Sequence, residues 1–270
     1  MNLNEKEFYR LRDFMYQKFG INLSAKKMLI EGRLSNTLSA KGFKSFTEFI
    51  DHLESDKTGE ALSLVVTKLT TNFTYFYREE QHFEYMKKVA LPEILPTIRD
   101  GNLNIWSAGC SSGEEPYTIA MFLDEYFHGG RTDLDKRILA TDISDKVLAI
   151  AKKGLYHEER MTRMPPNWQR SYFRHLGGDE FEVKAKIKNE VIYRKFNLME
   201  PVFRFKRKFH IVFCRNVMIY FDTDTITKLA QRFYDALMPG GYLFIGLSET
   251  LIKNRTSFEY VQPSIYRKKR

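Results

Sequence analysis

The sequence contains few cysteines, no long apolar run and no spacing typical of a metal site. Its two cysteines, Cys110 and Cys214, lie far apart and form no CxxC pair, so reduced thiols are expected. No run of 18 or more apolar residues occurs, which argues against a membrane-spanning helix. The six histidines show neither HxxxH nor HExxH spacing, so we expect no metal site. The opening MNLNEKEFYRLRDF does not resemble a signal peptide, and a cytoplasmic location is expected.

The formal net charge of +9 is unevenly distributed along the chain. Basic side chains dominate residues 152–215, and the chain ends on Arg267-Lys268-Lys269-Arg270. Such a surface favours an acidic partner, whether nucleic acid, a membrane surface or an acidic protein. A merely solvated basic face is the alternative, and charge alone does not choose among these.

Residues 1–71 predict a small all-α domain. In its first segment apolar residues recur at helical spacing and Gly20 is a typical stop: Phe8, Leu11, Phe14, Met15 and Phe19. We expect Ser24 to cap a second helix that ends near Gly42, and two more short helices over 45–53 and 59–69. Residues 72–98 are expected to be a linker.

From residue 99 onwards strands and helices alternate. Strands are expected over 104–108, 137–142, 191–196, 209–213 and 242–245, and helices over 114–127, 144–153 and 223–237. This alternation predicts an α/β domain with a doubly wound parallel sheet and helices on both faces. Residues 155–190 break the alternation with Pro165-Pro166, Gly177-Gly178 and an alternating FEVKAKI, which indicates an inserted subdomain with a β-hairpin.

A glycine turn, Gly109-x-x-x-Gly113, joins the first strand of this domain to its first helix. It lies at the carboxyl edge of the sheet, where ligands of such folds bind. It matches neither GxGxxG nor a P-loop. Glu114 and Glu115 follow directly, and carboxylates repel phosphate. The turn therefore favours a ligand with a cationic group and no phosphate, and S-adenosylmethionine fits because it carries an ammonium and a sulfonium.

Polar residues end the second and third strands. Asp142 is placed to accept both hydroxyls of a ribose; the alternative, a helix N-cap, suits Ser144 better. Asn197 and Leu198 occupy the place where adenine edges are commonly read, although an ordinary turn is an equal alternative.

Arg215 and Asn216 follow the fourth strand, within FCRNVMIYF. Enzymes that methylate amines carry Asp/Asn-Pro-Pro-Tyr/Phe at this place, and this chain does not. Arg215 and Tyr220 suit an anionic acceptor instead. In the linker, Asn72, Thr74 and Arg78 have spacings that leave them available to a ligand between the two domains.

In order along the chain, the segments TTNFTYFYRE, IWSAGCSSGEEPYTIAM, ATDIS, FNLM, FCRNVMIYF and LMPGGYLFIGLSE resemble those of chemotaxis receptor methyltransferases of the CheR type. The resemblance covers essentially the whole chain. It implies a small helical domain, a linker, and a Rossmann-like S-adenosylmethionine-dependent catalytic domain with a small β-subdomain.

The resemblance also implies roles for single residues. Asn72, Thr74, Arg78, Gly109, Glu115 (preferred over Glu114), Asp142, Asn197, Leu198, Arg215 and Asn216 would bind the cofactor. Tyr220 would lie near the acceptor, with Arg78 assisting. The implied acceptors are glutamates on the cytoplasmic helical region of chemoreceptors, methylated to glutamyl methyl esters during adaptation; a monomer is expected.

A carboxylate acceptor is ionised at neutral pH, so such an enzyme needs no general base. Two other functions remain open from the sequence. A nucleic-acid methyltransferase would account for the basic charge, although the amine-holding motif is missing. A non-catalytic adaptor that senses S-adenosylmethionine would need the same cofactor residues without turnover.

Overall fold

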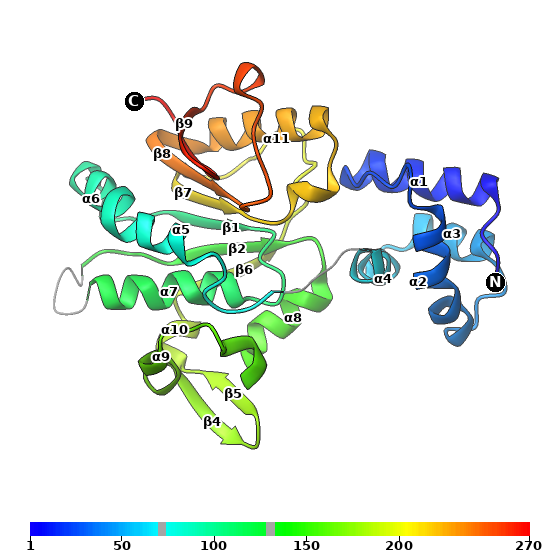
Figure 1. Cartoon of the computed structure of the whole chain (residues 1–270), viewed down its shortest axis with the longest axis horizontal. Coiled ribbons are helices and arrows are strands. Elements are labelled where there is room, and N and C mark those ends of the chain that lie inside the picture. Colours follow the sequence, from blue (N-terminus) through cyan, green and yellow to red (C-terminus); the bar gives the residue numbers. More distant parts are fainter. Residues whose placement is uncertain (70–73, 128–132) are drawn as a thin grey trace.

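The computed structural model describes residues 1–69, 74–127 and 133–270, and Figure 1 shows them arranged in two parts. The first part, here called the helical domain, contains the described helices α1 (Glu5–Phe19), α2 (Lys27–Ala40), α3 (Phe46–Ser55) and α4 (Glu60–Leu69). Buried apolar side chains from all four helices form its core, among them Leu11, Leu34, Phe49 and Val65. The predicted all-α domain is confirmed.

The ends of α1 are set by local sequence. Asn4 and Glu7 form a capping box, in which each side chain accepts a hydrogen bond from the other's backbone N–H at 2.9 Å. Gly20 takes a left-handed φ of 68° after the last turn, as its position predicts. The expected Ser24 cap is wrong: α2 begins at Lys27, and its N-cap residue makes no side-chain cap.

The second part is an α/β domain built on one sheet, whose described strands have the order β6-β2-β1-β7-β8-β10-β9. Its parallel strands are β1 (Ile105–Ala108), β2 (Ile138–Asp142), β6 (Val191–Lys195), β7 (Phe209–Cys214) and β8 (Leu237–Ile245). The edge strands β9 (Glu259–Gln262) and β10 (Ile265–Arg267) run antiparallel. The predicted parallel sheet is confirmed, and the antiparallel edge was not predicted.

Helices cover both faces of this sheet, as expected (Figure 1). One face packs on α7 (Glu114–Tyr126), α8 (Asp145–Lys153) and a linker segment composed of α5 (Glu80–Tyr85), the π-helical turn η1 (Met86–Ala90), α6 (Leu91–Ile94) and η2 (Leu95–Thr97). The other face packs on α11 (Thr223–Ala236). There Trp106 contacts the rings of Phe203, Phe205 and Phe233 at centroid distances of 4.8–5.4 Å.

The insert is a small subdomain beside α7. It contains β3 (Leu155–His157), η3 (Glu158–Met161), α9 (Pro166–Tyr172), β4 (Phe173–Gly177), β5 (Glu180–Val183) and α10 (Ala185–Lys188). Its described strands form a sheet in the order β3-β5-β4, with β4 and β5 as an antiparallel hairpin. The hairpin is therefore as predicted, but FEVKAKI is only partly strand because AKIK forms α10.

The remaining helical turns are η4 (Met218–Tyr220), after β7, and η5 (Lys253–Arg255), before β9. The strand expected over 242–245 is longer in the structure, because β8 begins at Leu237 and includes Pro239, Gly240 and Gly241. Within the described part of the chain, no helix combines the length and the apolar character that crossing a bilayer would require. The same residues contain no group of three or more histidine, cysteine or acidic side chains suited to a metal ion.

Candidate active site

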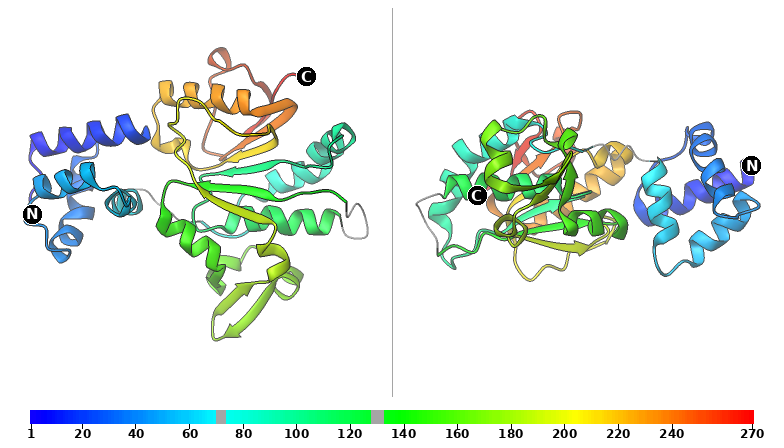
Figure 2. Two further views of the ribbon diagram at one scale, coloured as in Figure 1. Left: turned by 180° about the vertical axis from the view of Figure 1, so that it is seen from behind. Right: turned by 90° about the horizontal axis from the view of Figure 1, so that it is seen from below.

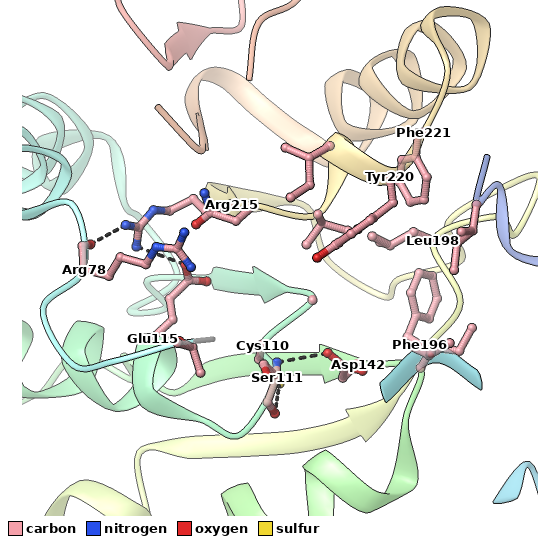
Figure 3. A pocket seen from close by; sticks show the side chains of 18 of the residues that line it. Arg78, Cys110, Ser111, Glu115, Asp142, Phe196, Leu198, Arg215, Tyr220 and Phe221 are labelled. Atoms are coloured by element: carbon pink, nitrogen blue, oxygen red, sulfur yellow. Dashed lines mark hydrogen bonds and ion pairs between the residues drawn. The ribbon is translucent and has the colours of Figure 1, made fainter. Parts of the chain in front are cut away.

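A cavity of about 380 Å³ lies at the carboxyl ends of the parallel strands (Figure 3). In Figure 1 this edge of the sheet faces the helical domain. Its volume falls in the range of small-molecule sites. Every site residue predicted from the sequence that the structure describes lines this cavity: Thr74, Arg78, Gly109, Glu115, Asp142, Asn197, Leu198, Arg215, Asn216 and Tyr220. Asn72 lies outside the described residues.

The glycine turn after β1 brings bare backbone to the cavity. Gly109 has a φ of 82°, and a Cβ on it would lie 2.5 Å from Cγ2 of Val217. The N–H groups of Gly109 and Cys110 both donate to the carbonyl oxygen of Thr141 at 2.8 Å. The turn is thus fastened to the end of β2, and neither its conformation nor its surroundings accept a side chain at position 109.

Asp142 is half-buried at the end of β2, beside that turn (Figure 3). Its Oδ2 accepts the N–H of Ser111 and its Oδ1 accepts the N–H of Ser144, each at 2.9 Å. Burial raises the pKa of Asp142, while these backbone donors act in the opposite direction. Each oxygen keeps a further lone pair for a hydroxyl donor. The N-cap of α8 is Ser144, as expected, and not Asp142.

Glu114 and Glu115, adjacent at the start of α7, face different surroundings. Glu114 is 1% exposed, and the Ser112 hydroxyl donates to its Oε2 at 2.7 Å. Glu115 lines the cavity, with Oε1 accepting from the Ser107 hydroxyl at 2.7 Å and Oε2 from Nη1 of Arg215 at 3.1 Å. Burial raises the pKa of Glu115, and Arg215 counteracts this effect. Of the two, Glu115 is therefore the one available to a ligand.

Arg215 is bound into a buried network with carboxylates from two other segments. Besides Glu115, it donates from Nε and Nη2 to Oε2 of Glu79 at 3.2 and 3.1 Å, and from Nη2 to the carbonyl oxygen of Arg78. Its guanidinium lies 5.3 Å above the ring of Phe83. The sequence predicted Arg215 but not Glu79, although Glu79 stands in the same TTNFTYFYRE segment as the predicted Arg78.

Glu249, a buried acid that follows β8, holds the loops after β7 and β8. Its carboxylate accepts the backbone N–H groups of Asn216, Ile219 and Gly246 at 3.0, 3.2 and 2.6 Å. Burial raises its pKa, and the same backbone donors act against that rise. The conformation of the Arg215–Tyr220 loop therefore depends on Glu249. Sequence reasoning missed this residue because two of its three backbone donors, Asn216 and Ile219, lie 33 and 30 residues before it in the chain.

Asn197 lines the cavity, but its amide is already engaged inside the protein. Nδ2 donates to the carbonyl oxygen of Lys18 at 2.9 Å, and Oδ1 accepts from the N–H of Met199 at 2.9 Å. One N–H of Nδ2 and one lone pair of Oδ1 remain beyond these two bonds, so the reading of a base by this amide stays a prediction. Leu198 and Phe196 add apolar surface at this end of the cavity (Figure 3).

Tyr220 reaches from η4 into the cavity, with its hydroxyl directed toward the centre (Figure 3). Arg78 and Thr74 line the opposite, linker side. Arg78 also lies near the ring of Tyr75, at 5.9 Å from the centroid. The cavity thus brings the predicted acceptor-side residues Tyr220 and Arg78 into one space with Glu115 and Asp142.

The helical domain supplies part of the cavity wall, which the sequence did not predict. Phe19, Ile21 and Val66 line it. No local pattern distinguishes them from core residues, because their role depends on how the domains pack.

Polar contacts across the domain boundary hold this wall in place. The hydroxyl of Tyr16 donates to Oδ2 of Asp222 at 2.7 Å, and the Asn22 N–H donates to the carbonyl oxygen of Tyr220 at 2.8 Å. Asn197 contributes its bond to Lys18. These contacts join α1 and the segment after it to the loops after β6 and β7 (Figure 2).

The cavity therefore combines two acids with an apolar end. Glu115 suits a cationic group and Asp142 suits a pair of hydroxyls. The apolar surface of Phe196 and Leu198 suits a flat ring. The described lining residues include no histidine or lysine.

Comparison with known proteins gives a consistent answer along the chain. Residues 72–267 match the family model described as the CheR methyltransferase, SAM binding domain, and residues 6–70 match the CheR methyltransferase, all-alpha domain. A chemotaxis protein methyltransferase of Borreliella burgdorferi is 46% identical, covering 99% of this chain and 96% of the relative. Chemotaxis protein methyltransferase 1 of Pseudomonas aeruginosa is 36% identical with full coverage of both, and that of Escherichia coli K12 is 34% identical over 98% and 91%.

The all-alpha model matches the helical domain, and the SAM-binding model matches the linker and the α/β domain. Both matched parts contribute residues to the cavity. The chain therefore belongs to the CheR methyltransferase family and carries its S-adenosylmethionine-binding domain.

Proposed function

We propose that this chain transfers a methyl group from S-adenosylmethionine to glutamate side chains of chemoreceptors, the methyl-accepting chemotaxis proteins, in chemotactic adaptation. The observation that carries the proposal is one cavity lined by Glu115, Asp142 and Tyr220 in a CheR-family chain. The names of the relatives as chemotaxis protein methyltransferases support a receptor substrate on the cytoplasmic side.

The donor set of the cavity fits this cofactor. Glu115 would accept from the ammonium of its methionyl end, and Asp142 from the two ribose hydroxyls. The adenine end would rest on the apolar surface of Leu198 and Phe196, and the remaining N–H and lone pair of the Asn197 amide would read its edge. Thr74 and Arg78 would contact the cofactor from the linker, as would Asn72.

When bound, S-adenosylmethionine supplies an electrophilic methyl group on a sulfonium sulfur. The acceptor carboxylate is already ionised near neutral pH, since glutamate has a reference pKa of about 4.3. The chain therefore has to align the acceptor and exclude water rather than remove a proton. Tyr220 would orient the carboxylate by donating from its hydroxyl. Arg215 is bonded to Glu79 and Glu115, so we assign it to holding the site rather than to gripping the acceptor.

The test is transfer of labelled methyl from S-adenosylmethionine to cytoplasmic fragments of chemoreceptors, followed by mild alkali. We expect base-labile label that is released as methanol, as carboxyl methyl esters require. Asp142→Ala should abolish transfer. Asp145→Ala is the matched control, because Asp145 lies three residues away and pairs with Lys195 on the surface. Label that survives alkali would instead indicate an N- or C-methylated product, and cofactor binding without any transfer would favour a sensor.

Two neighbouring substitutions test which acid holds the methionyl end. Glu115→Gln removes the charge that faces the cavity and should weaken binding of S-adenosylhomocysteine by about tenfold or more. Glu114→Gln removes a charge that is bonded to Ser112 and lies outside the lining, and should change stability more than affinity. Isothermal titration measures both, and equal losses of affinity would contradict the assignment.

A further inference from the structure

Glu79 is a buried carboxylate that lies beside the cavity without lining it. Its side chain is 10% exposed, and that of its partner Arg215 is 2% exposed. We propose that Glu79 is a positioning residue for the cofactor site, which holds Arg215 so that Glu115 stays available to the ammonium of the methionyl end. This inference rests on the proposed cofactor role of Glu115.

The hydrogen bonds of Arg215 are divided unequally between the two acids. Its Nε and Nη2 both donate to Oε2 of Glu79, at 3.2 and 3.1 Å, whereas only Nη1 donates to Glu115, at 3.1 Å. Arginine prefers to bind a carboxylate with two parallel N–H groups. Because Glu79 takes the Nε–Nη2 edge, Glu115 receives one N–H from Arg215. Its other oxygen is fixed by the Ser107 hydroxyl at 2.7 Å, so Glu115 is oriented without being paired along a full edge.

The charges of this cluster favour a cation. In their ionised forms Glu79 and Glu115 contribute two formal negative charges, and Arg215 contributes one positive charge. His82, which contacts Glu79 at 3.4 Å, is neutral at physiological pH because burial, followed by the charge of Arg215, lowers its pKa to about 3. The cluster therefore carries one net negative charge beside the cavity. A neutral residue at position 79 removes that charge and frees the guanidinium edge to rotate onto Glu115.

The backbone around Glu79 is held in conformations that are unfavourable for residues other than glycine. Glu79, Asn216 and Ser264 have φ values of 58°, 59° and 62°. All three belong to one network: Nδ2 of Asn216 donates to Oε1 of Glu79 at 3.3 Å, and the Ser264 hydroxyl contacts Nε2 of His82 at 2.6 Å. The Leu247 N–H also donates to Oε1 of Glu79, at 3.4 Å. Unfavourable backbone gathered around one carboxylate is typical of a group that is held for function.

The experiment compares two ligands in the full-length chain. S-adenosylhomocysteine contains the methionyl end, whereas 5′-methylthioadenosine contains only the nucleoside and its thioether. We expect Glu79→Gln to weaken S-adenosylhomocysteine binding by about tenfold to a hundredfold and to leave 5′-methylthioadenosine binding within about twofold of wild type. Glu80→Gln, the same substitution at the exposed neighbouring residue, should leave both affinities unchanged.

Equal weakening of both ligands would overturn the proposal, because it would indicate general disruption of the cavity. Unchanged binding of S-adenosylhomocysteine would overturn it as well. Should Glu79→Gln fail to fold, Glu79→Asp keeps the charge but withdraws the carboxylate by one methylene, and the same selective loss is expected. If the wild-type chain binds neither ligand, the proposed cofactor function itself is refuted, and the role of Glu79 is refuted with it.

Discussion

Acid should destabilise this protein in part through the buried histidine His82. The side chain is 0% exposed on α5, and burial, followed by the charge of Arg215, lowers its pKa to about 3, while Glu79 acts in the opposite direction. In the unfolded chain a histidine has a pKa of about 6.5. Between these values the unfolded state binds a proton that the folded state does not, so the free energy of unfolding falls as the pH falls through 6.5.

The magnitude follows from the linkage relation. At pH 5 the folded state takes up almost no proton at His82, whereas the unfolded state is about 97% protonated there. The difference between pH 7 and pH 5 is then about 2 kcal/mol for this one residue. In His82→Asn this contribution disappears. The variant should therefore lose about 2 kcal/mol less stability than wild type over the same interval, whatever its absolute stability at pH 7.

The assay is urea unfolding at pH 7, 6 and 5, followed by the fluorescence of the two tryptophans, Trp106 and Trp168, which are both buried in the α/β domain. At each pH the free energy of unfolding is measured for both proteins. The compared quantity is its change between pH 7 and pH 5 in wild type minus the same change in His82→Asn. His157→Asn, at an exposed histidine of β3, is the matched control and should behave like wild type. An equal loss of unfolding free energy between pH 7 and pH 5 in wild type and His82→Asn would show that His82 does not contribute to the acid sensitivity.

Three further predictions concern the turn after β1, an exposed glycine of α2 and the domain boundary. Gly109→Ala should lower stability by about 2 kcal/mol or more, because its φ of 82° and the 2.5 Å approach to Val217 exclude a Cβ. Gly32→Ala, at a position inside α2 where a Cβ would meet nothing within 4 Å, should raise stability by about 0.5–1 kcal/mol. Thermal unfolding measures both glycine variants, and a destabilised Gly32→Ala would contradict the expectation. Tyr16→Phe removes the 2.7 Å bond to Asp222 and should cost about 0.5–1.5 kcal/mol, measured by urea unfolding with fluorescence; an unchanged midpoint would show that the contact contributes nothing.

The parallel sheet was predictable because its signals are local. Each parallel strand contains a short apolar run. Gly20 ends α1 and Ser144 begins α8 through their own conformation and hydrogen bonds. The misses arose where distant contacts decide. AKIK became α10 although it continues an alternating pattern, and the edge strands β9 and β10 depend on pairing with β8.

The site was predictable to the extent that its residues follow strands. The carboxyl ends of parallel strands meet at one edge, so Gly109, Asp142, Leu198 and Arg215 line the same cavity. The direction in which each side chain points was not predictable from the residues alone. Glu114 and Glu115 are adjacent and chemically alike, yet only Glu115 lines the cavity. Their individual roles toward a ligand stay predictions.

Partners such as Glu79 and Glu249 were missed for a different reason. Their function is to bind other protein groups, namely Arg215 in one case and the backbone of three separate positions in the other. A single sequence records the residue type but not the contact. The available signals were an acid shortly after β8 for Glu249 and an acid beside the predicted Arg78 for Glu79, and neither distinguishes a structural role from a catalytic one.

The cavity wall formed by Phe19, Ile21 and Val66 has a thermodynamic consequence. A ligand that needs this wall is bound fully only while the helical domain is docked on the α/β domain, so ligand binding and docking are linked equilibria. The free energy that docking contributes to ligand binding equals the free energy that the ligand contributes to docking. A macromolecule that holds the surface of α1–α4 would therefore alter the affinity for the ligand without touching it, and the ligand concentration would in turn alter how firmly that macromolecule is held.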